Sequence, residues 1–125
     1  MAFIRGIRGA ITVERNNSEE IMEATQELLR TIIESNQLVL EDIGSVFFTS
    51  TEDLNAEFPA KAARAIGWDH VPLFCTLELP VEGALARCIR VLIQVNTNKS
   101  QKEIKHVYLR DAVSLRPDLV DGHRP

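Results

Sequence analysis

The segment ARCIRVLIQVNT, residues 86–97, decides the fold class, because apolar and polar side chains alternate along it with the period of a β-strand. One side of the strand is branched and apolar: Ile89, Val91, Ile93 and Val95. The other side carries Cys88, Arg90, Leu92, Gln94 and Asn96. We therefore predict that this is the longest strand of a sheet, with one face in the core and a more polar opposite face.

The flanking segments complete a mixed α+β pattern. Further strands are predicted at residues 3–13, 45–51, 71–77 and 106–109, helices at 17–36 and 58–67, and a short helical turn at 100–103. Asn17 begins the first helix with Glu20 as its capping partner, and Pro59 and Gly67 bracket the second. Strands and helices alternate irregularly, which favours an open mixed sheet with helices packed on one face.

Length and composition limit the kinds of partner. With 125 residues, 45% of them hydrophobic, the chain is expected to form a single domain over residues 1–125. A formal net charge of -4 makes nucleic acids and anionic membranes poor partners. No export signal is visible and no stretch has the ~18 apolar residues of a membrane span, so we expect a cytoplasmic protein. The spacing of Cys75 and Cys88 does not match a zinc site, and two cysteines do not make a disulfide scaffold, so we expect neither.

The basic residues favour recognition of a small anion. Ten of the fourteen are arginines, whose planar guanidinium groups bind carboxylate or phosphate in a bidentate manner. Arg90 lies mid-strand between apolar neighbours, where an unpaired charge is costly. The residues alone leave two alternatives: an ion pair with a carboxylate such as Glu78, or an anionic ligand. Arg8 poses the same question, and the adjacent Gly6 and Gly9 leave room for a ligand or for closely packed backbone.

Other reactive side chains give no catalytic pattern. Cys75 and His106 are conceivable as a nucleophile and base, but no oxyanion loop or orienting acid accompanies them. Glu78 and Glu82 have Pro80 between them and so do not share a helix face. The histidines lack metal spacing and no glycine-rich phosphate loop is present. We expect neither a metal nor a bound nucleotide.

Five segments together are more specific than any single residue. They are RGIRGAITVE at 5–14, FPAKAAR at 58–64, CIRV at 88–91, HVYL at 106–109 and LRPDL at 115–119. In this order and spacing the chain resembles the monofunctional, AroH-type chorismate mutases from about residue 4 to residue 119. The resemblance implies a chorismate-mutase-like (ferredoxin-like) domain that assembles as a homotrimer, a pseudo α/β barrel with active sites between subunits. It also implies a cofactor-free Claisen rearrangement of chorismate to prephenate, in phenylalanine and tyrosine biosynthesis.

The resemblance further implies which residues carry the reaction. Arg90 would be the main donor to the ether oxygen of chorismate and to a side-chain carboxylate, and Arg8 would clamp a carboxylate with the help of Tyr108. Glu78 would accept a hydrogen bond from the ring hydroxyl and lie near the developing positive charge. Cys75 would be a weak polar contact close by.

A second set of residues would bind and enclose the substrate. The adjoining subunit would supply a wall and an electrostatic gate from Phe58, Lys61 and Arg64. Leu115 and Arg116 belong to a C-terminal segment that Arg116 would bring over the mouth of the site. Phe74 is bulkier than the small polar residue expected there, so its contact is expected through the backbone only. The tail at residues 120–125 carries no recognisable motif and is expected to be disordered.

Two other functions remain open at this stage. Trimeric imine deaminases of the YjgF type share the general fold and arginine-containing sites between subunits, but their C-terminal arginine and cysteine signature is missing here. A non-enzymatic trimer that binds a small anion would keep the arginines without requiring Glu78.

Overall fold

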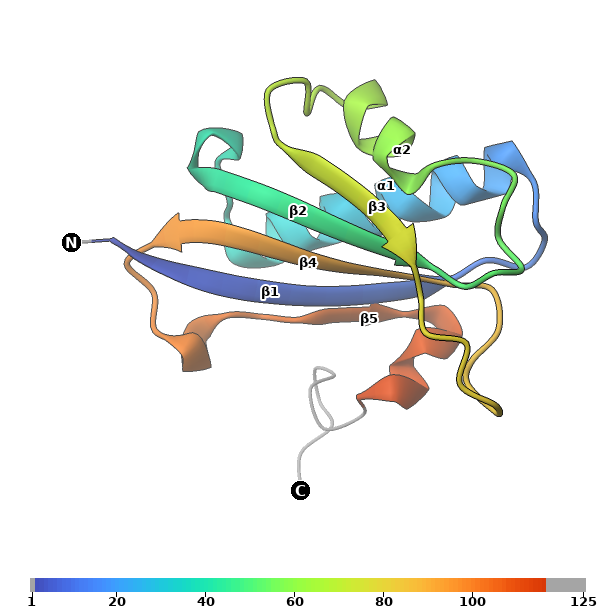
Figure 1. Cartoon of the computed structure of the whole chain (residues 1–125). Helices are drawn as coiled ribbons and strands as arrows, with labels where there is room; N and C mark the ends of the chain where they lie inside the picture. Colours follow the sequence, from blue (N-terminus) through green and yellow to red (C-terminus); the bar gives the residue numbers. More distant parts are fainter. Residues whose placement is uncertain (1, 117–125) are drawn as a thin grey trace.

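The computed structural model describes residues 2–116 and has one mixed sheet with helices against it (Figure 1). The strands are β1 (Phe3–Thr12), β2 (Ile43–Ser50), β3 (Leu73–Leu77), β4 (Cys88–Thr97) and β5 (Val107–Leu109). The α-helices are α1 (Ser18–Asn36) and α2 (Pro59–Ala65), and the 3-10 turns are η1 (Leu40–Asp42), η2 (Gln101–Glu103) and η3 (Arg110–Leu115). The predicted α+β class is confirmed, whereas the expected tail at residues 120–125 lies outside the described residues.

The strands lie in the order β3-β2-β4-β1-β5, so the segment that suggested the fold is the central strand. Both neighbours of β4, which are β1 and β2, run antiparallel to it. The edge strands β5 and β3 run parallel to β1 and β2, respectively. The prediction that residues 86–97 form the longest strand is wrong in one detail, since β1 and β4 both have 10 residues.

Both helices begin and end as their sequences predict. The side chain of Asn17 accepts a hydrogen bond from the backbone N–H of Glu20 at 2.8 Å, which satisfies one of the free donors at the start of α1. Pro59 occupies the first turn of α2, and Gly67 follows its end with a φ of 96°, a conformation that glycine adopts without strain. No helix among residues 2–116 is long and apolar enough to cross a membrane.

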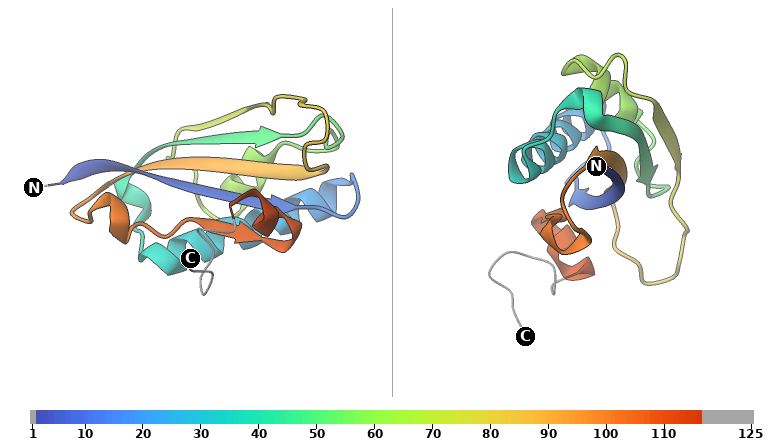
Figure 2. Two further views of the ribbon diagram at one scale, coloured as in Figure 1. Left: turned by 90° about the horizontal axis from the view of Figure 1, so that it is seen from below. Right: turned by 90° about the vertical axis from the view of Figure 1, so that its left-hand side faces the viewer.

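One face of the sheet, here called the covered face, forms the core beneath α1 and α2, which lie on the same side in Figure 2. All four apolar residues predicted on one side of β4 are buried there. Gly9 is required for this packing, because a Cβ atom at that position would lie 2.8 Å from Cδ1 of Ile32 in α1. Close approach of a helix, rather than room for a ligand, therefore explains Gly9.

The opposite face, here called the open face, carries the alternate residues of each strand. Cross-strand pairing places Arg8, Leu92, Phe47 and Phe74 in one row across four strands. At the end of the sheet η3 packs against this face, where Ala112 joins Ala10 and Cys88 in a small buried cluster. The sequence did not predict η3, and most of the open face has no element above it in the described residues.

Candidate functional site

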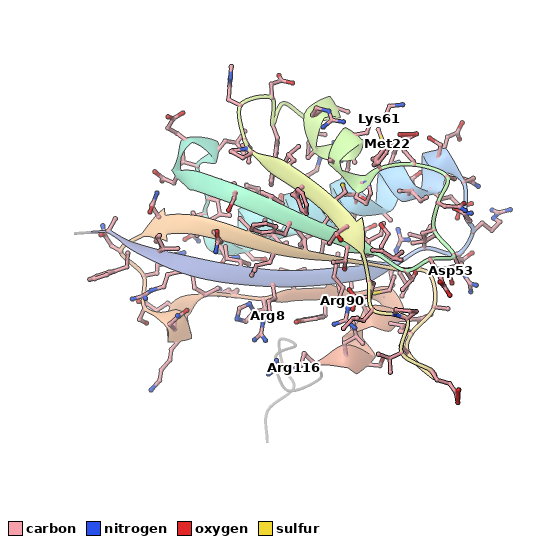
Figure 3. All side chains as sticks on the ribbon, viewed as in Figure 1. Arg8, Met22, Asp53, Lys61, Arg90 and Arg116 are labelled. Atoms are coloured by element: carbon pink, nitrogen blue, oxygen red, sulfur yellow. The ribbon has the colours of Figure 1, made fainter. Side chains whose placement is uncertain are left out.

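Two of the predicted site residues lie side by side because of the strand register. Ala10 of β1 pairs with Arg90 of β4 on one side and with Tyr108 of β5 on the other. Paired residues point to the same face of a sheet, so both long side chains lie on the open face with the small Ala10 between them. Arg8 precedes Ala10 by two residues and lies on the same face, near Arg90 and Arg116 in Figure 3.

Glu78 joins this group from just beyond β3. Its backbone N–H donates to the carbonyl of Ser50 at 2.9 Å, which extends the pairing of β2 and β3 by one bond. Thr49, directly opposite Arg90 in the register, donates its hydroxyl hydrogen to Oε1 of Glu78. The other carboxylate oxygen, Oε2, lies 3.5 Å from Nε of Arg90. The ion pair that the sequence offered as one alternative is therefore present.

This ion pair leaves Arg90 with hydrogen-bonding capacity. Its Nε atom is buried and has no hydrogen-bond partner among residues 2–116, although the carboxylate of Glu78 is near. The side chain as a whole is 42% exposed, so part of the guanidinium faces the open side of the sheet. The exposed part of the guanidinium can therefore offer its terminal N–H groups to an anion bound on the open face.

A small apolar cluster lies next to one end of the group formed by Arg8, Arg90, Tyr108 and Glu78. Tyr108 and Leu115 pack against the cluster of Ala10, Cys88 and Ala112. Burial raises the pKa of the Cys88 thiol to about 11, so it is neutral at physiological pH and acts as a small apolar side chain. Leu115 and Tyr108 are therefore two partly buried side chains packed against the same small cluster.

The remaining predicted residues form a second group around the start of α2 and the edge of β3. Phe58 and Cys75 line a surface cavity of about 470 Å³. Lys61 is exposed on α2, with Nζ 3.5 Å from Oε1 of Glu57. Burial raises the pKa of the Cys75 thiol, while a hydrogen bond from the Ala60 backbone and the positive charge of Arg64 act in the opposite direction. The thiol thus lies within the electrostatic reach of α2.

The two groups lie on opposite sides of the sheet. Cys75 pairs with the fully buried Phe48 and faces the side that α2 covers, whereas Glu78 turns to the open face. Figure 3 likewise shows Lys61 on α2, away from Arg8 and Arg90. Within one chain, Cys75 therefore belongs with α2 rather than beside Glu78, where the sequence analysis expected it.

Residues 4–119 match the family model for chorismate mutase type I. The chain belongs to this family. It is 51% identical over 118 residues to a protein named chorismate mutase AroH from Bacillus subtilis (strain 168), with 94% of this chain and 93% of that protein covered. A Thermus thermophilus protein of the same name is 54% identical over 118 residues, covering 94% of this chain and 97% of that protein.

A solved structure, the chorismate mutase from Clostridium thermocellum, shares the fold with a TM-score of 0.86 and 50% sequence identity. The match covers 87% of this chain and 97% of that one. The family that the five sequence segments indicated is confirmed, and with it the enzyme class, since chorismate mutases are isomerases. The imine deaminase alternative gains no support from these comparisons.

Strand β3 determines which way the side chains of Phe74 and Cys75 point. Phe74 points to the open face, away from Cys75, and its ring meets that of Phe47 edge-on with centroids 6.1 Å apart. Its side chain is therefore available on the open face, beyond the backbone contact that we expected. Cys75 on β3 and His106 before β5 belong to opposite edges of the sheet, so they form no nucleophile and base pair.

The structure adds two residues to this group that the sequence did not indicate as site residues. Thr49 holds the carboxylate of Glu78, and the Nδ1 atom of His106 accepts a hydrogen bond from the backbone N–H of Arg8 at 2.9 Å. Strand alternation could have placed Thr49 on the open face, two residues after Phe47. The partner of His106 could not be found in this way, because the contact depends on the register of two strands far apart in sequence.

Proposed function

We propose that this chain catalyses the Claisen rearrangement of chorismate to prephenate, as a step in phenylalanine and tyrosine biosynthesis. The observation that carries the proposal is the open-face group of Arg8, Arg90, Tyr108 and Glu78, in a chain of the chorismate mutase type I family. Chorismate carries two carboxylates, for which fixed guanidinium groups are suitable partners. A phenol and a carboxylate on the same surface suit its remaining polar groups.

The chemistry of the reaction fits a site that has no nucleophile. The ether C–O bond breaks while a new C–C bond forms between the enolpyruvyl side chain and the ring, and the electrons move around one closed cycle. No atom enters or leaves and no proton is transferred. The site therefore has two tasks, which are to hold the compact reactive conformer and to stabilise the charge that develops in the transition state.

We assign the second task to Arg90. Negative charge grows on the ether oxygen as its bond breaks, and a donor already fixed in place stabilises that charge more strongly than it stabilises the ground state. Glu78 limits the movement of the Arg90 guanidinium through the contact of 3.5 Å with Nε. In the same arrangement Glu78 accepts from the ring hydroxyl and faces the positive charge that develops on the ring.

The first task falls to the residues around Arg90. Arg8 binds a carboxylate together with Tyr108, which fixes the side chain of chorismate over its ring. Leu115 packs against the same small cluster as Tyr108, and Arg116 brings a further positive charge to the mouth of the site. Holding the reactive conformer in this way removes part of the entropic barrier of a unimolecular reaction.

We further propose that neighbouring copies of the chain complete the site. The group of Phe58, Lys61, Arg64 and Cys75 lies on the other side of the sheet and therefore meets the open face of another copy rather than its own. The contact joins two different surfaces, so it repeats head to tail, and it forms a ring where the rotation between copies closes. The family resemblance implies that the ring is a homotrimer.

The apolar part of the open face favours the same assembly. Phe74, Phe47 and Leu92 lie in one row and are 59%, 39% and 38% exposed. Large apolar side chains grouped on a surface mark an interaction site, and a second copy of the chain would cover them. The free thiols of Cys75 and Cys88 fit a reducing compartment, so we place the enzyme in the cytoplasm.

The activity is tested directly with purified protein. Incubation with chorismate should consume the diene absorbance of the substrate and yield prephenate, which acid converts to phenylpyruvate. Arg90→Ala protein prepared in parallel is the control for contaminating enzyme. Absence of prephenate at micromolar concentrations of folded protein would contradict the proposed function.

The shared site is tested by mixing two inactive variants. Arg90→Ala chains retain Arg64, and Arg64→Ala chains retain Arg90. After dissociation and reassembly, each mixed ring should regenerate a single unaltered site, so activity should rise above that of either variant alone. Reassembly of Arg90→Ala protein with itself is the control. If mixed trimers confirmed by native mass spectrometry recover no activity, the two groups do not meet across subunits.

A further inference from the structure

We propose that His106 is a positioning residue for Arg8, whose backbone it fixes by accepting the Arg8 N–H on its Nδ1 atom. This inference rests on the proposed function, in which Arg8 binds a carboxylate of chorismate. It assigns to His106 an effect on substrate binding that passes through Arg8, with no contact between the imidazole and the substrate.

The contact continues a strand pairing that the backbone does not complete. The parallel ladder between β1 and β5 begins at Gly9 and Val107, so it does not reach Arg8. At this position the imidazole provides the acceptor, and the distance from the Arg8 nitrogen to Nδ1 is 2.9 Å. Because Nδ1 accepts, the proton of the neutral ring is on Nε2. The side chain of His106 thus extends the contact between β1 and β5 by one residue, to Arg8.

The backbone before His106 is itself held by the core. Asn36 at the end of α1 is 1% exposed and pairs with both backbone groups of Lys105. Its amide donates to the Lys105 carbonyl at 2.9 Å, and its oxygen accepts the Lys105 N–H at 2.8 Å. Since Lys105 directly precedes His106, the imidazole projects from a fixed point. A contact of this kind transmits the rigidity of α1 to Arg8.

The surroundings of His106 favour the neutral ring that this contact needs. Its side chain is half-buried, and burial lowers its pKa below the ordinary value. The positive charges of Arg8 on β1 and of Arg116 after η3 lower it further. A protonated ring has no free lone pair and could not accept the Arg8 N–H. At neutral pH the acceptor is therefore available.

A fixed backbone matters for Arg8 because its side chain is long and exposed. Ordering such a side chain on a carboxylate costs conformational entropy, and the cost rises if the strand that carries it is also mobile. The carboxylate contact exists in both the ground state and the transition state. Loss of the His106 contact should therefore raise KM and leave kcat nearly unchanged.

The test compares a variant that keeps the acceptor with one that removes it. His106→Asn places an amide oxygen near the position of Nδ1, whereas His106→Leu keeps the volume and offers no acceptor. We expect KM of the Asn variant to stay within about twofold of the wild-type value, and KM of the Leu variant to rise about tenfold. Equal KM values for the two variants, or a loss confined to kcat, would overturn the proposal.

A double-variant measurement separates positioning from a general structural role. In an Arg8→Ala background, His106→Leu should cause no further change in kcat/KM, because its effect passes through Arg8. A second loss of the same size in that background would overturn the proposal. If the Leu variant does not fold, His106→Gln replaces it, since its amide reaches the position of Nε2 rather than Nδ1.

A readout that needs no activity keeps this proposal distinct from the proposed function. The ¹⁵N chemical shifts of His106 should show an unprotonated Nδ1 at neutral pH, and the backbone amide of Arg8 should shift in the Leu variant but much less in the Asn variant. A protonated Nδ1, or an Arg8 amide indifferent to both substitutions, would overturn the contact. Wild-type protein that shows these shifts but converts no chorismate would instead refute the proposed function alone.

Discussion

The two faces of the same sheet differ in what completes them. On the covered face, Ile89 and its neighbours are packed beneath α1 and α2, and the chain itself supplies every contact that buries them. On the open face, Arg90 holds a buried Nε without a hydrogen-bond partner among the described residues, and Phe74 stays exposed. Folding of the single chain therefore accounts for the covered face. A bound ligand or another copy of the chain is needed to account for Arg90 and the exposed apolar side chains of the open face.

The two glycines of β1 show the same contrast at single positions. Gly9 faces the helix, where an added Cβ would lie within 3.2 Å of side chains from α1 and β4. Gly6 lies on the open face, where an added Cβ would meet only the flexible side chain of Leu92, at 3.3 Å. Two glycines of one strand thus differ in that Gly9 meets several packed side chains of the core, whereas Gly6 meets one side chain that can move.

Adjacent residues of β4 give the largest expected difference between the faces. Arg90→Ala should lower kcat by about 10²–10³-fold, because it removes the donor to the ether oxygen, with little change in melting temperature. Ile89→Ala should lower the free energy of unfolding by about 2–5 kcal/mol, because it leaves a cavity in the core, with kcat of the folded fraction nearly unchanged. Discontinuous assays of prephenate formation measure kcat of both variants, and calorimetry measures their stability.

The stability of Arg90→Ala provides the control in this comparison. Its partner Glu78 is also partly exposed, so breaking their ion pair should change stability by less than about 1 kcal/mol. An Arg90→Ala protein that is unstable but has wild-type specific activity would mean that the ion pair serves the fold alone. The open face would then need no ligand to explain it.

An intermediate effect is expected where the open face meets another copy. Leu92→Asp places a charge in the apolar row and should disperse the assembly into smaller species, because a buried unpaired carboxylate is strongly unfavourable. Analytical ultracentrifugation over a range of concentrations measures this change. Gln94→Asp, on the same face of β4, is the matched control and should leave the assembly intact. A Leu92→Asp protein that sediments as the wild type would remove the apolar row from the interface.

The smallest expected difference between the two faces is in the reactivity of the two thiols. Cys88 is buried in the small cluster under η3, and its pKa of about 11 leaves almost no thiolate at pH 8. Cys75 is half-exposed beside the surface cavity. Maleimide should therefore label Cys75 first and Cys88 only after unfolding, as followed by mass spectrometry. Prephenate should slow the labelling of Cys75 if this thiol belongs to the shared site, and faster labelling of Cys88 would contradict its burial.

Much of the fold follows from patterns a few residues long. The alternation in β4 predicted which of its side chains enter the core, and Asn17, Pro59 and Gly67 predicted where α1 begins and α2 begins and ends. These signals are local, because side-chain direction and capping depend on near neighbours in the chain. The turn η3 carried no such signal and was missed.

The sequence indicated most of the candidate site residues but not their arrangement. Five short segments indicated the family, and through it the residues Arg8, Arg90, Glu78 and Tyr108. The sequence also raised the Arg90–Glu78 pair as an alternative to ligand binding, and the structure contains that pair while leaving Nε of Arg90 without a hydrogen bond. The pairing of His106 with Arg8 joins residues 98 positions apart, so no pattern within either segment contains it.

The sequence by itself determined the strands, the two α-helices, the two faces of β4 and the family, since each of these depends on local periodicity or on short motifs. Tertiary structure alone decided that Thr49 holds Glu78, that His106 holds Arg8, and that the α2 group lies on the other side of the sheet from Arg90. The physical reason is that strand order and register depend on pairing between segments far apart in the sequence. Such pairing brings together residues that no local sequence pattern relates to one another. Those contacts divide the candidate site into two groups within one chain.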